Sequence, residues 1–175
     1  MYQKISCGVR FFKVIFNSGN ESDINSIMWN KNSDKLLTAS DNAKIFNVLT
    51  GEWIKDFKGN SGKISWALWV DNDTKIITAE VEKCMKLWSV DGNLLHTWKD
   101  FWYIDVVWNK ENNLIWFHAG SNKIKVLDLD TKLIVASFEE EEKIRSISMS
   151  GDGKFLLTNW SEVNPAINLW SIDQK

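Results

Sequence analysis

Four stretches of the sequence follow one pattern: INSIMWN (24–30), ISWALWV (64–70), YIDVVWN (103–109) and IRSISMS (144–150). The sixth residue of each stretch is an anchor, and the anchors are Trp29, Trp69, Trp108 and Met149. They stand 40, 39 and 41 residues apart. A fixed period of about 20 to 50 residues is typical of repeat architectures, in which each repeat is one small structural unit.

A second apolar run follows each anchor after a polar gap. It reads Leu36-Leu37-Thr38, Ile76-Ile77-Thr78, Ile115-Trp116-Phe117 and Leu156-Leu157-Thr158. The gaps are rich in Asn, Asp, Gly and Ser, which favour tight turns. Two apolar runs joined by such a gap predict a β-hairpin.

Two further runs complete each unit. The third reads AKIFNV (43–48), MKLWSV (85–90), IKVLDL (124–129) and INLWSI (167–172), and the fourth reads EWIKDF (52–57), NLLHTW (93–98) and LIVASF (133–138). Short strands at regular spacing indicate an all-β fold, and the period near 40 selects a β-propeller. The mostly apolar third run predicts an inner strand, and the more polar fourth run predicts an outer edge strand.

These units resemble the WD40-type repeat. The segment Ser150-Gly151-Asp152-Gly153-Lys154, followed by Leu156-Leu157-Thr158, is similar to the turn and second strand of that repeat. Leu87-Trp88-Ser89 and Leu169-Trp170-Ser171 are similar to its third strand. The resemblance covers residues 24–173 and implies about four four-stranded antiparallel blades, arranged as a partial or open propeller.

The units also depart from the family pattern. No Gly-His dipeptide precedes a first strand, and the Asp after the third-strand aromatic survives only as Asp128. We therefore expect the family's buried Asp-His-Ser-Trp hydrogen-bond network to be missing from all four units. The blades are then expected to rely on apolar packing, to which the eleven tryptophans contribute.

A finer resemblance concerns residues 91–98, DGNLLHTW, together with the order of the blades around them. They are similar to the WD-repeat subunit of the CTLH/GID ubiquitin ligase, as are residues 143–172. The alternative is a degenerate WD repeat unrelated to that ligase.

The repeat predicts one propeller region over residues 1–175, with blades at approximately 24–57, 63–98, 102–138 and 143–173. The last unit ends after its third strand, whereas VRFFKVIF (9–16) supplies a spare outer strand before the first unit. Three arrangements remain open. The four blades could close on themselves, two chains could form a homodimeric eight-bladed ring, or the chain could be an open arc from a longer propeller. We expect the open arc ahead of the dimer.

Composition bears on partners and location. The net charge of −2 and the pI of about 5.7 argue against nucleic acid and anionic membrane as partners. Cys7 and Cys84 are too few for a disulfide framework, so reduced thiols are expected. The chain has no apolar run long enough to cross a membrane and no signal-peptide pattern. We expect a cytoplasmic protein, with the nucleus as the second location.

Residues with catalytic chemistry do not gather in the sequence. The two histidines, His96 and His118, lack the spacing of metal ligands and are expected to be surface or packed residues. The run 139–142, four consecutive glutamates, is expected to be a solvated loop. The sequence therefore predicts no catalytic residue, no metal and no cofactor.

Candidate partner-binding residues flank the first strands, because the loops that lead into these strands line one face of a propeller. The candidates are Trp102, Lys63, Asp23, Lys143, Arg145 and Asn25. Trp102 stands out because its equivalents in the other units are charged, and exposed Trp and Arg are favoured hot-spot residues. The alternative is that Trp102 packs into a neighbouring blade. Trp53 and Trp66 are weaker candidates.

The resemblance implies a non-catalytic scaffold or adaptor that binds other proteins or peptides, within a ubiquitin ligase or another multiprotein complex. Two alternatives stay open, since a fold does not fix a function. A nucleic-acid-associated WD-repeat protein would need a basic face, for which Lys63, Lys143 and Arg145 are a faint sign. A propeller enzyme would need carboxylates or histidines gathered at the central channel.

Overall fold

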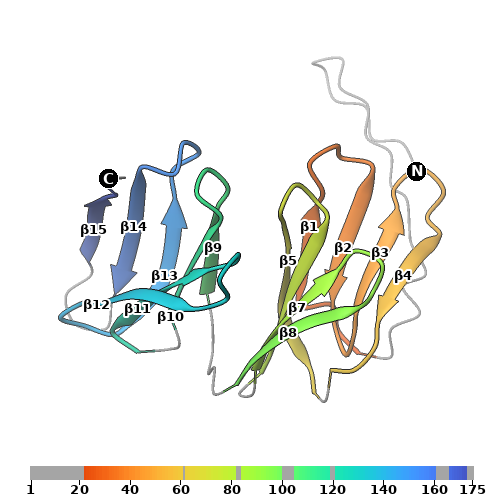
Figure 1. Ribbon diagram of the computed structural model, residues 1–175, viewed down its shortest axis with the longest axis horizontal. Helices are drawn as coiled ribbons and strands as arrows, with labels where there is room; N and C mark the ends of the chain where they lie inside the picture. Colours follow the sequence, from red (N-terminus) through yellow and green to blue (C-terminus); the bar gives the residue numbers. More distant parts are fainter. Residues whose placement is uncertain are drawn as a thin grey trace, which may run out of the picture.

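The computed structural model describes residues 22–60, 62–81, 84–99, 105–118, 121–160 and 166–172. These residues form four separate antiparallel sheets, and each sheet is one blade (Figure 1). No helix occurs among them. The all-β propeller-type fold class predicted from the sequence is confirmed. The spare strand 9–16 and Trp102 lie outside the described residues.

The strands follow one another in sequence order within every blade. Blade 1 contains β1 (Ser26–Trp29), β2 (Lys35–Ala39), β3 (Ala43–Asn47) and β4 (Trp53–Phe57), and blade 2 contains β5 (Ile64–Val70), β6 (Lys75–Glu80), β7 (Cys84–Ser89) and β8 (Leu94–Lys99). Blade 3 contains β9 (Asp105–Asn109), β10 (Leu114–His118), β11 (Lys123–Asp128) and β12 (Ile134–Glu139), and blade 4 contains β13 (Ile144–Met149), β14 (Phe155–Trp160) and β15 (Ala166–Ser171).

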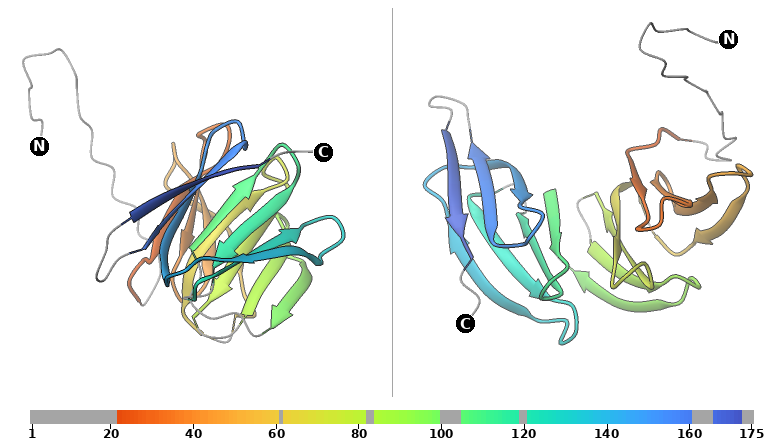
Figure 2. Two further views of the ribbon diagram at one scale, coloured as in Figure 1. Left: turned by 90° about the vertical axis from the view of Figure 1, so that its left-hand side faces the viewer. Right: turned by 90° about the horizontal axis from the view of Figure 1, so that it is seen from above.

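The blades stand side by side along an arc (Figure 2). Their first strands lie on the concave side and their fourth strands on the outer side, and one side of the arc is open. The four blades therefore do not close on themselves.

Hairpin turns between first and second strands depend on residues that tolerate positive φ. Asn113 has a φ of 56° in blade 3 and Gly153 a φ of 69° in blade 4. A Cβ on Gly153 would lie 2.5 Å from the side-chain oxygen of Asn109, and the Asn109 amide donates to the Gly153 carbonyl at 2.9 Å. Glycine at position 153 thus allows the turns of blades 3 and 4 to meet.

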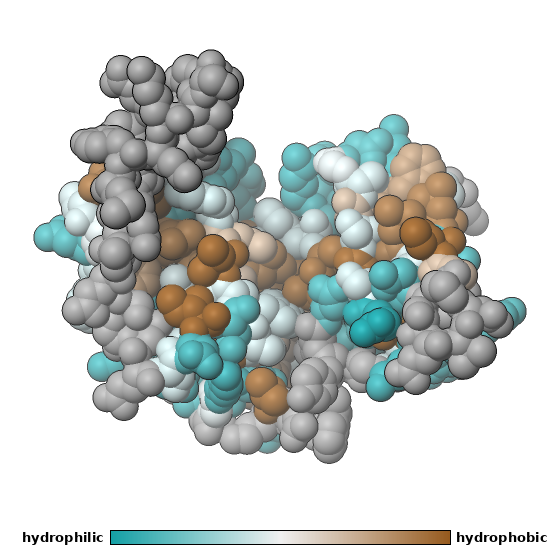
Figure 3. All heavy atoms as spheres, turned by 180° about the vertical axis from the view of Figure 1, so that it is seen from behind, coloured by the Kyte–Doolittle hydropathy of each residue, from teal (hydrophilic) through white to brown (hydrophobic). Residues whose placement is uncertain are grey.

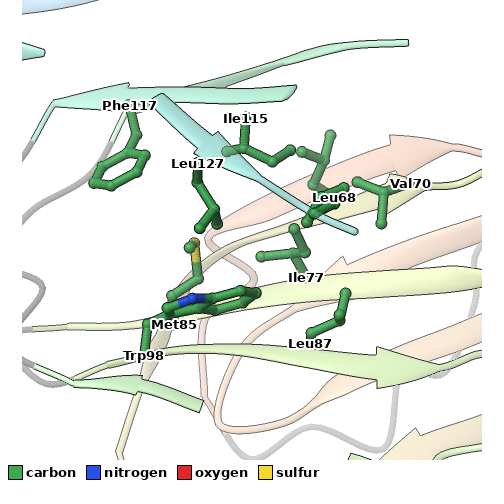
Figure 4. Packing of buried hydrophobic residues seen from close by; sticks show 10 residues of the cluster. Leu68, Val70, Ile77, Met85, Leu87, Trp98, Ile115, Phe117 and Leu127 are labelled. Carbon is green, nitrogen blue, oxygen red and sulfur yellow. The ribbon is translucent and has the colours of Figure 1, made fainter. Parts of the chain in front are cut away.

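The hydrophobic core lies between the blades, and the sheet register explains how. Each blade has a front row that faces the preceding blade and a back row that faces the following one. In blade 2 the back row is Leu68, Ile77 and Leu87. It packs on the front row of blade 3, which contains Ile115 and Leu127 (Figure 4) and the half-buried Trp108. Equivalent rows pack between blades 1 and 2 and between blades 3 and 4.

Tryptophans of the front rows also carry hydrogen bonds. The Trp88 indole donates to the Thr78 hydroxyl at 2.9 Å in blade 2. In blade 4 the Trp170 indole lies 3.2 Å from the equivalent hydroxyl, that of Thr158, and donates to Glu140 at 3.0 Å. The expectation that the blades rely on apolar packing alone is therefore wrong for blades 2 and 4.

Glu140 also corrects the expectation of a solvated glutamate run. This side chain is only 6% exposed, and it accepts from Thr158, from Trp170 and from the Asn168 amide at 2.9 Å. Its neighbours Glu139, Glu141 and Glu142 are exposed. Glu140 is thus the centre of a hydrogen-bond network in blade 4, where the family's usual network is missing. Its three donors offset the cost of burying the carboxylate.

Removing the Glu140 carboxylate should destabilise the protein. Glu140→Ala leaves the donors of Thr158 and Asn168 without this acceptor and leaves the Trp170 indole only the Thr158 hydroxyl at 3.2 Å. We therefore expect the free energy of unfolding to fall by about 2 to 4 kcal/mol. Urea unfolding followed by circular dichroism measures it. The matched control Glu141→Ala, one residue along and exposed, should change it by less than about 0.5 kcal/mol. Equal effects of the two substitutions would contradict the buried network.

Candidate partner-binding site

A hollow of about 820 Å³ lies at one end of the arc's concave side. It is lined by the last residues of the four first strands, β1, β5, β9 and β13, and by the hairpin turns that follow them. The four blades thus contribute equivalent positions to one concave surface, and a concave surface is the usual form of a binding site.

Aromatic side chains give this hollow its apolar area. Trp29 is 56% exposed and Trp108 is half-buried, and both line the hollow. The Trp108 indole donates to the Asn113 side-chain oxygen at 3.4 Å. Trp69 lies between them in chain order but is buried, and its indole donates to the Met28 carbonyl at 3.4 Å. The hollow therefore presents two accessible indole rings.

Polar residues of the turns surround the rings. The backbone N–H of Lys31 donates to Asp73 at 2.8 Å, and the Lys31 ammonium donates to Asn72 at 3.1 Å. Lys110 and Glu111 supply one charge of each sign from blade 3. Amides, carboxylates and ammonium groups around an apolar floor match the backbone and side chains of a peptide.

Metal-binding and membrane-spanning features are absent from the residues that the structure describes. No group of three His, Cys, Asp or Glu side chains that could hold a metal ion occurs in the part of the chain that the structure describes. Neither histidine lines the hollow. Within the same residues, no helix has the length and apolarity needed to cross a membrane.

Comparison with known proteins finds WD-repeat relatives. The sequence profile described as "WD domain, G-beta repeat" matches residues 12–46. A WD repeat-containing protein WDS homolog from Arabidopsis thaliana is 26% identical over 87% of this chain and 30% of its own length. The chain resembles WD-repeat proteins in its sequence and in its four-stranded blades.

Two other WD-repeat relatives extend the comparison. GID complex subunit 7 from Schizosaccharomyces pombe is 24% identical over 64% of this chain and 23% of its own length. A WD repeat-containing protein 26 homolog from Arabidopsis thaliana is 24% identical over 89% of this chain and 27% of its own length. The chain therefore spans less than a third of the length of these relatives. WD-repeat proteins generally act as scaffolds that bind other proteins.

The candidate residues predicted from the sequence lie at the other end of the first strands. Asp23 and Asn25 precede β1, Lys63 precedes β5, Lys143 precedes β13 and Arg145 is its second residue. All five side chains are exposed, and none lines the hollow. Their role as a binding face stays a prediction, and Trp102 lies outside the described residues.

Asn25 differs from the other four because its side chain is engaged. Its amide donates to the carbonyl of Ile64 at 2.7 Å and so ties blade 1 to the first strand of blade 2. Sequence reasoning treated Trp29 and Trp108 only as anchors of the repeat and so missed them as binding candidates. The available signal was the place of Trp29 in the first unit. No described blade stands in front of this unit, so its anchor is left exposed.

His118, at the end of β10, is buried, and neither ring nitrogen has a hydrogen-bond partner among the described residues. Burial lowers the pKa of His118 below its ordinary value; nearby Asp105 opposes this shift and Lys143 adds to it. The folded protein thus favours the neutral imidazole. Ala39 and Ala79 occupy the equivalent positions of blades 1 and 2.

The lowered pKa of His118 should make stability depend on pH. The unfolded chain takes up a proton on His118 near pH 6.5, and the folded chain does so only at lower pH. The contribution of neutral His118 to the free energy of unfolding is therefore complete above pH 6.5 and is lost as the pH falls below 6.5. The slope is at most about 1.4 kcal/mol per pH unit for one proton. Urea unfolding between pH 7.5 and 5.5 measures this pH dependence, and the comparison is between the variants and the unchanged chain. His118→Ala should remove this part of the decline and the control His96→Ala should keep it; the same slope in both would contradict the assignment.

Proposed function

We propose that this WD-repeat chain is a non-catalytic adaptor that binds a peptide or an exposed segment of another protein in the hollow of its arc. The observation that carries the proposal is the pair of accessible indole rings, Trp29 and Trp108, on a concave floor ringed by amides and charges. Tryptophan is enriched among residues that dominate binding energy. A bound apolar side chain would remove these rings from water.

A ubiquitin ligase is the assembly that we propose for this adaptor. Support comes from the similarity to GID complex subunit 7, a relative whose printed name places it in a complex. The sequence similarity of residues 91–98 and 143–172 points in the same direction. We place the protein in the cytoplasm, with the nucleus as the alternative. We also include a second copy of the chain among its partners, because the open arc leaves two blade faces without a neighbouring blade among the described residues.

Selection of peptides on the immobilised chain tests the binding role. A random-peptide display library supplies the ligands, and calorimetry gives the Kd of the best of them. Trp108→Leu keeps an apolar side chain against blade 2 but removes the ring from the hollow, and it should weaken binding at least about tenfold. The matched control Trp53→Leu, on the exposed outer strand β4, should leave the Kd unchanged.

Arg145→Ala shows which end of the arc binds. Loss of affinity in Arg145→Ala, with none in Trp108→Leu, would move the site to the face predicted from the sequence. A library that yields no peptide would contradict the adaptor role. Mass spectrometry of complexes that co-purify with the tagged chain from its own cells tests the ligase proposal, and the absence of ubiquitin-ligase subunits would overturn it.

A further inference from the structure

The outer strand of blade 3, β12, begins with a run of exposed apolar residues. Leu133 is 64% exposed, Ile134 is 44% exposed and Val135 is 53% exposed. Hydrophobic residues reach the surface on both halves of the molecule (Figure 3), but these three are consecutive and lead into one strand. A run of three exposed apolar residues is unfavourable for a protein in water unless it has a function.

This exposure is found with the neighbouring blade in place. Ile134 pairs with Leu127, which belongs to the front row of blade 3, so the two side chains share the face that looks toward blade 2. Blade 2 is present there, and its Trp98 indole donates to the Lys132 carbonyl at 3.0 Å, directly before the run. The apolar run is therefore open although blade 2 stands beside it.

The free edge of β12 also lacks the charges that protect edge strands. Among the described residues β12 pairs only with β11, so alternate N–H and C=O groups face outward. The centre of the outer strand is Lys55-Asp56 in blade 1, His96-Thr97 in blade 2 and Ala136-Ser137 in blade 3. Charged side chains discourage a further strand from pairing. No charged residue occurs from Leu133 to Phe138, so nothing of this kind opposes pairing at β12.

Both ends of β12 are held in place. Before the strand, the Lys132 N–H donates to the Asp128 carbonyl at 2.8 Å. After the strand, the Glu140 N–H donates to the Asn122 carbonyl at 2.7 Å, and the Asn122 amide donates back to the Glu140 carbonyl at 2.8 Å. An edge that is already fixed in strand conformation loses little conformational entropy when it pairs.

Acidic side chains outnumber basic ones at both ends of this edge. They are Asp128 and Asp130 with Lys132 before the strand, and Glu139, Glu141 and Glu142 with Lys123 and Lys143 at its end. Lys123 already pairs with Glu139 at 2.6 Å, and Glu141 and Glu142 are exposed. The edge thus has an uncharged middle between two acidic ends, and its electrostatic complement is a segment with basic ends.

We propose that the free edge of β12 binds an extended segment of another protein as a fifth strand of blade 3. The segment runs antiparallel to β12, with uncharged β-branched or apolar residues in its middle and Lys or Arg at its ends. Main-chain hydrogen bonds and the apolar run supply the affinity, and the carboxylates select the partner. No residue of β12 lines the hollow, and β12 lies on the outer side of the arc, so this site is independent of the proposed function.

A synthetic peptide of alternating valine and threonine, with two lysines at each end, is the probe for this edge. Calorimetry on the 175-residue chain gives its Kd. The same peptide with glutamates in place of the lysines should bind at least about fivefold more weakly. A version with methylated interior backbone nitrogens keeps the side chains but cannot pair as a strand, and it should not bind. Equal affinity of the methylated peptide, or no binding of the probe at millimolar concentration, would overturn the proposal.

Hydrogen exchange with and without the probe locates the contact. The outward amides of β12 exchange freely in the chain alone, and the probe should slow exchange within Ile134–Glu139 while leaving β8 unchanged. Slower exchange only in the turns around the hollow would place the probe there. That outcome would overturn the edge site and leave the proposed function standing.

A matched pair of double variants tests the missing edge charges. Ala136→Lys with Ser137→Asp copies the centre of β4 into β12 without changing the net charge, and it should weaken probe binding at least about fivefold. The control Leu94→Lys with Leu95→Asp changes two exposed residues of β8 and should leave the Kd unchanged. Circular dichroism checks that both variants fold.

Two outcomes of these variants would contradict the proposal. One is an equal loss of affinity in both, since the probe would then not distinguish β12 from β8. The other is a dimer of the unchanged chain, seen by light scattering, that becomes a monomer in Ala136→Lys with Ser137→Asp. Such a dimer would show that a second copy of the chain, and not another protein, occupies the edge.

Discussion

Packing of one blade's front row on the previous blade's back row is the interaction on which the rest of this structure depends. A four-stranded sheet is apolar on both faces here, so no blade can bury itself alone. Within the described residues, each of the three main hydrophobic clusters spans two neighbouring blades. The same packing curves the chain into an arc, and the arc creates the hollow. Among the described residues no blade stands in front of blade 1 or behind blade 4, which explains why Trp29 is 56% exposed and Leu169 is 64% exposed.

Hydrogen bonds add specificity to these apolar junctions. Other hydrogen bonds stand in place of the family's usual network. Three donors bind Glu140 in blade 4, and the Trp88 indole donates to Thr78 in blade 2. The buried Lys86 makes a further polar contact: it pairs with Glu80 and donates to the Gly59 carbonyl at 2.8 Å, in the loop from blade 1. The contacts of Lys86 and Glu140 tie blades 2 and 4 to the loops that enter them. A buried polar group left unpaired at these positions would be costly.

Period and strand pattern were enough to predict the fold, since Trp29, Trp69 and Trp108 mark equivalent positions in sequence and in structure. The sequence could not separate these anchors by exposure, because exposure depends on whether another blade stands in front. For the same reason Glu140 looked like its exposed neighbours: its donors lie on β14 and β15, well beyond it in the chain. Loop position predicted a binding face, but the hollow forms at the opposite ends of the same strands through the curvature of the arc.

Urea unfolding of Trp69→Ala beside Trp53→Ala tests the dependence on blade-to-blade packing most directly. Both substitutions remove the same side chain, but Trp69 is 3% exposed at a junction and Trp53 is 62% exposed on an outer strand. Trp69→Ala should lower the free energy of unfolding by about 3 to 5 kcal/mol, or leave the chain unfolded, whereas Trp53→Ala should lower it by less than about 1 kcal/mol. Similar losses in the two variants would contradict the claim that the junctions hold the fold together.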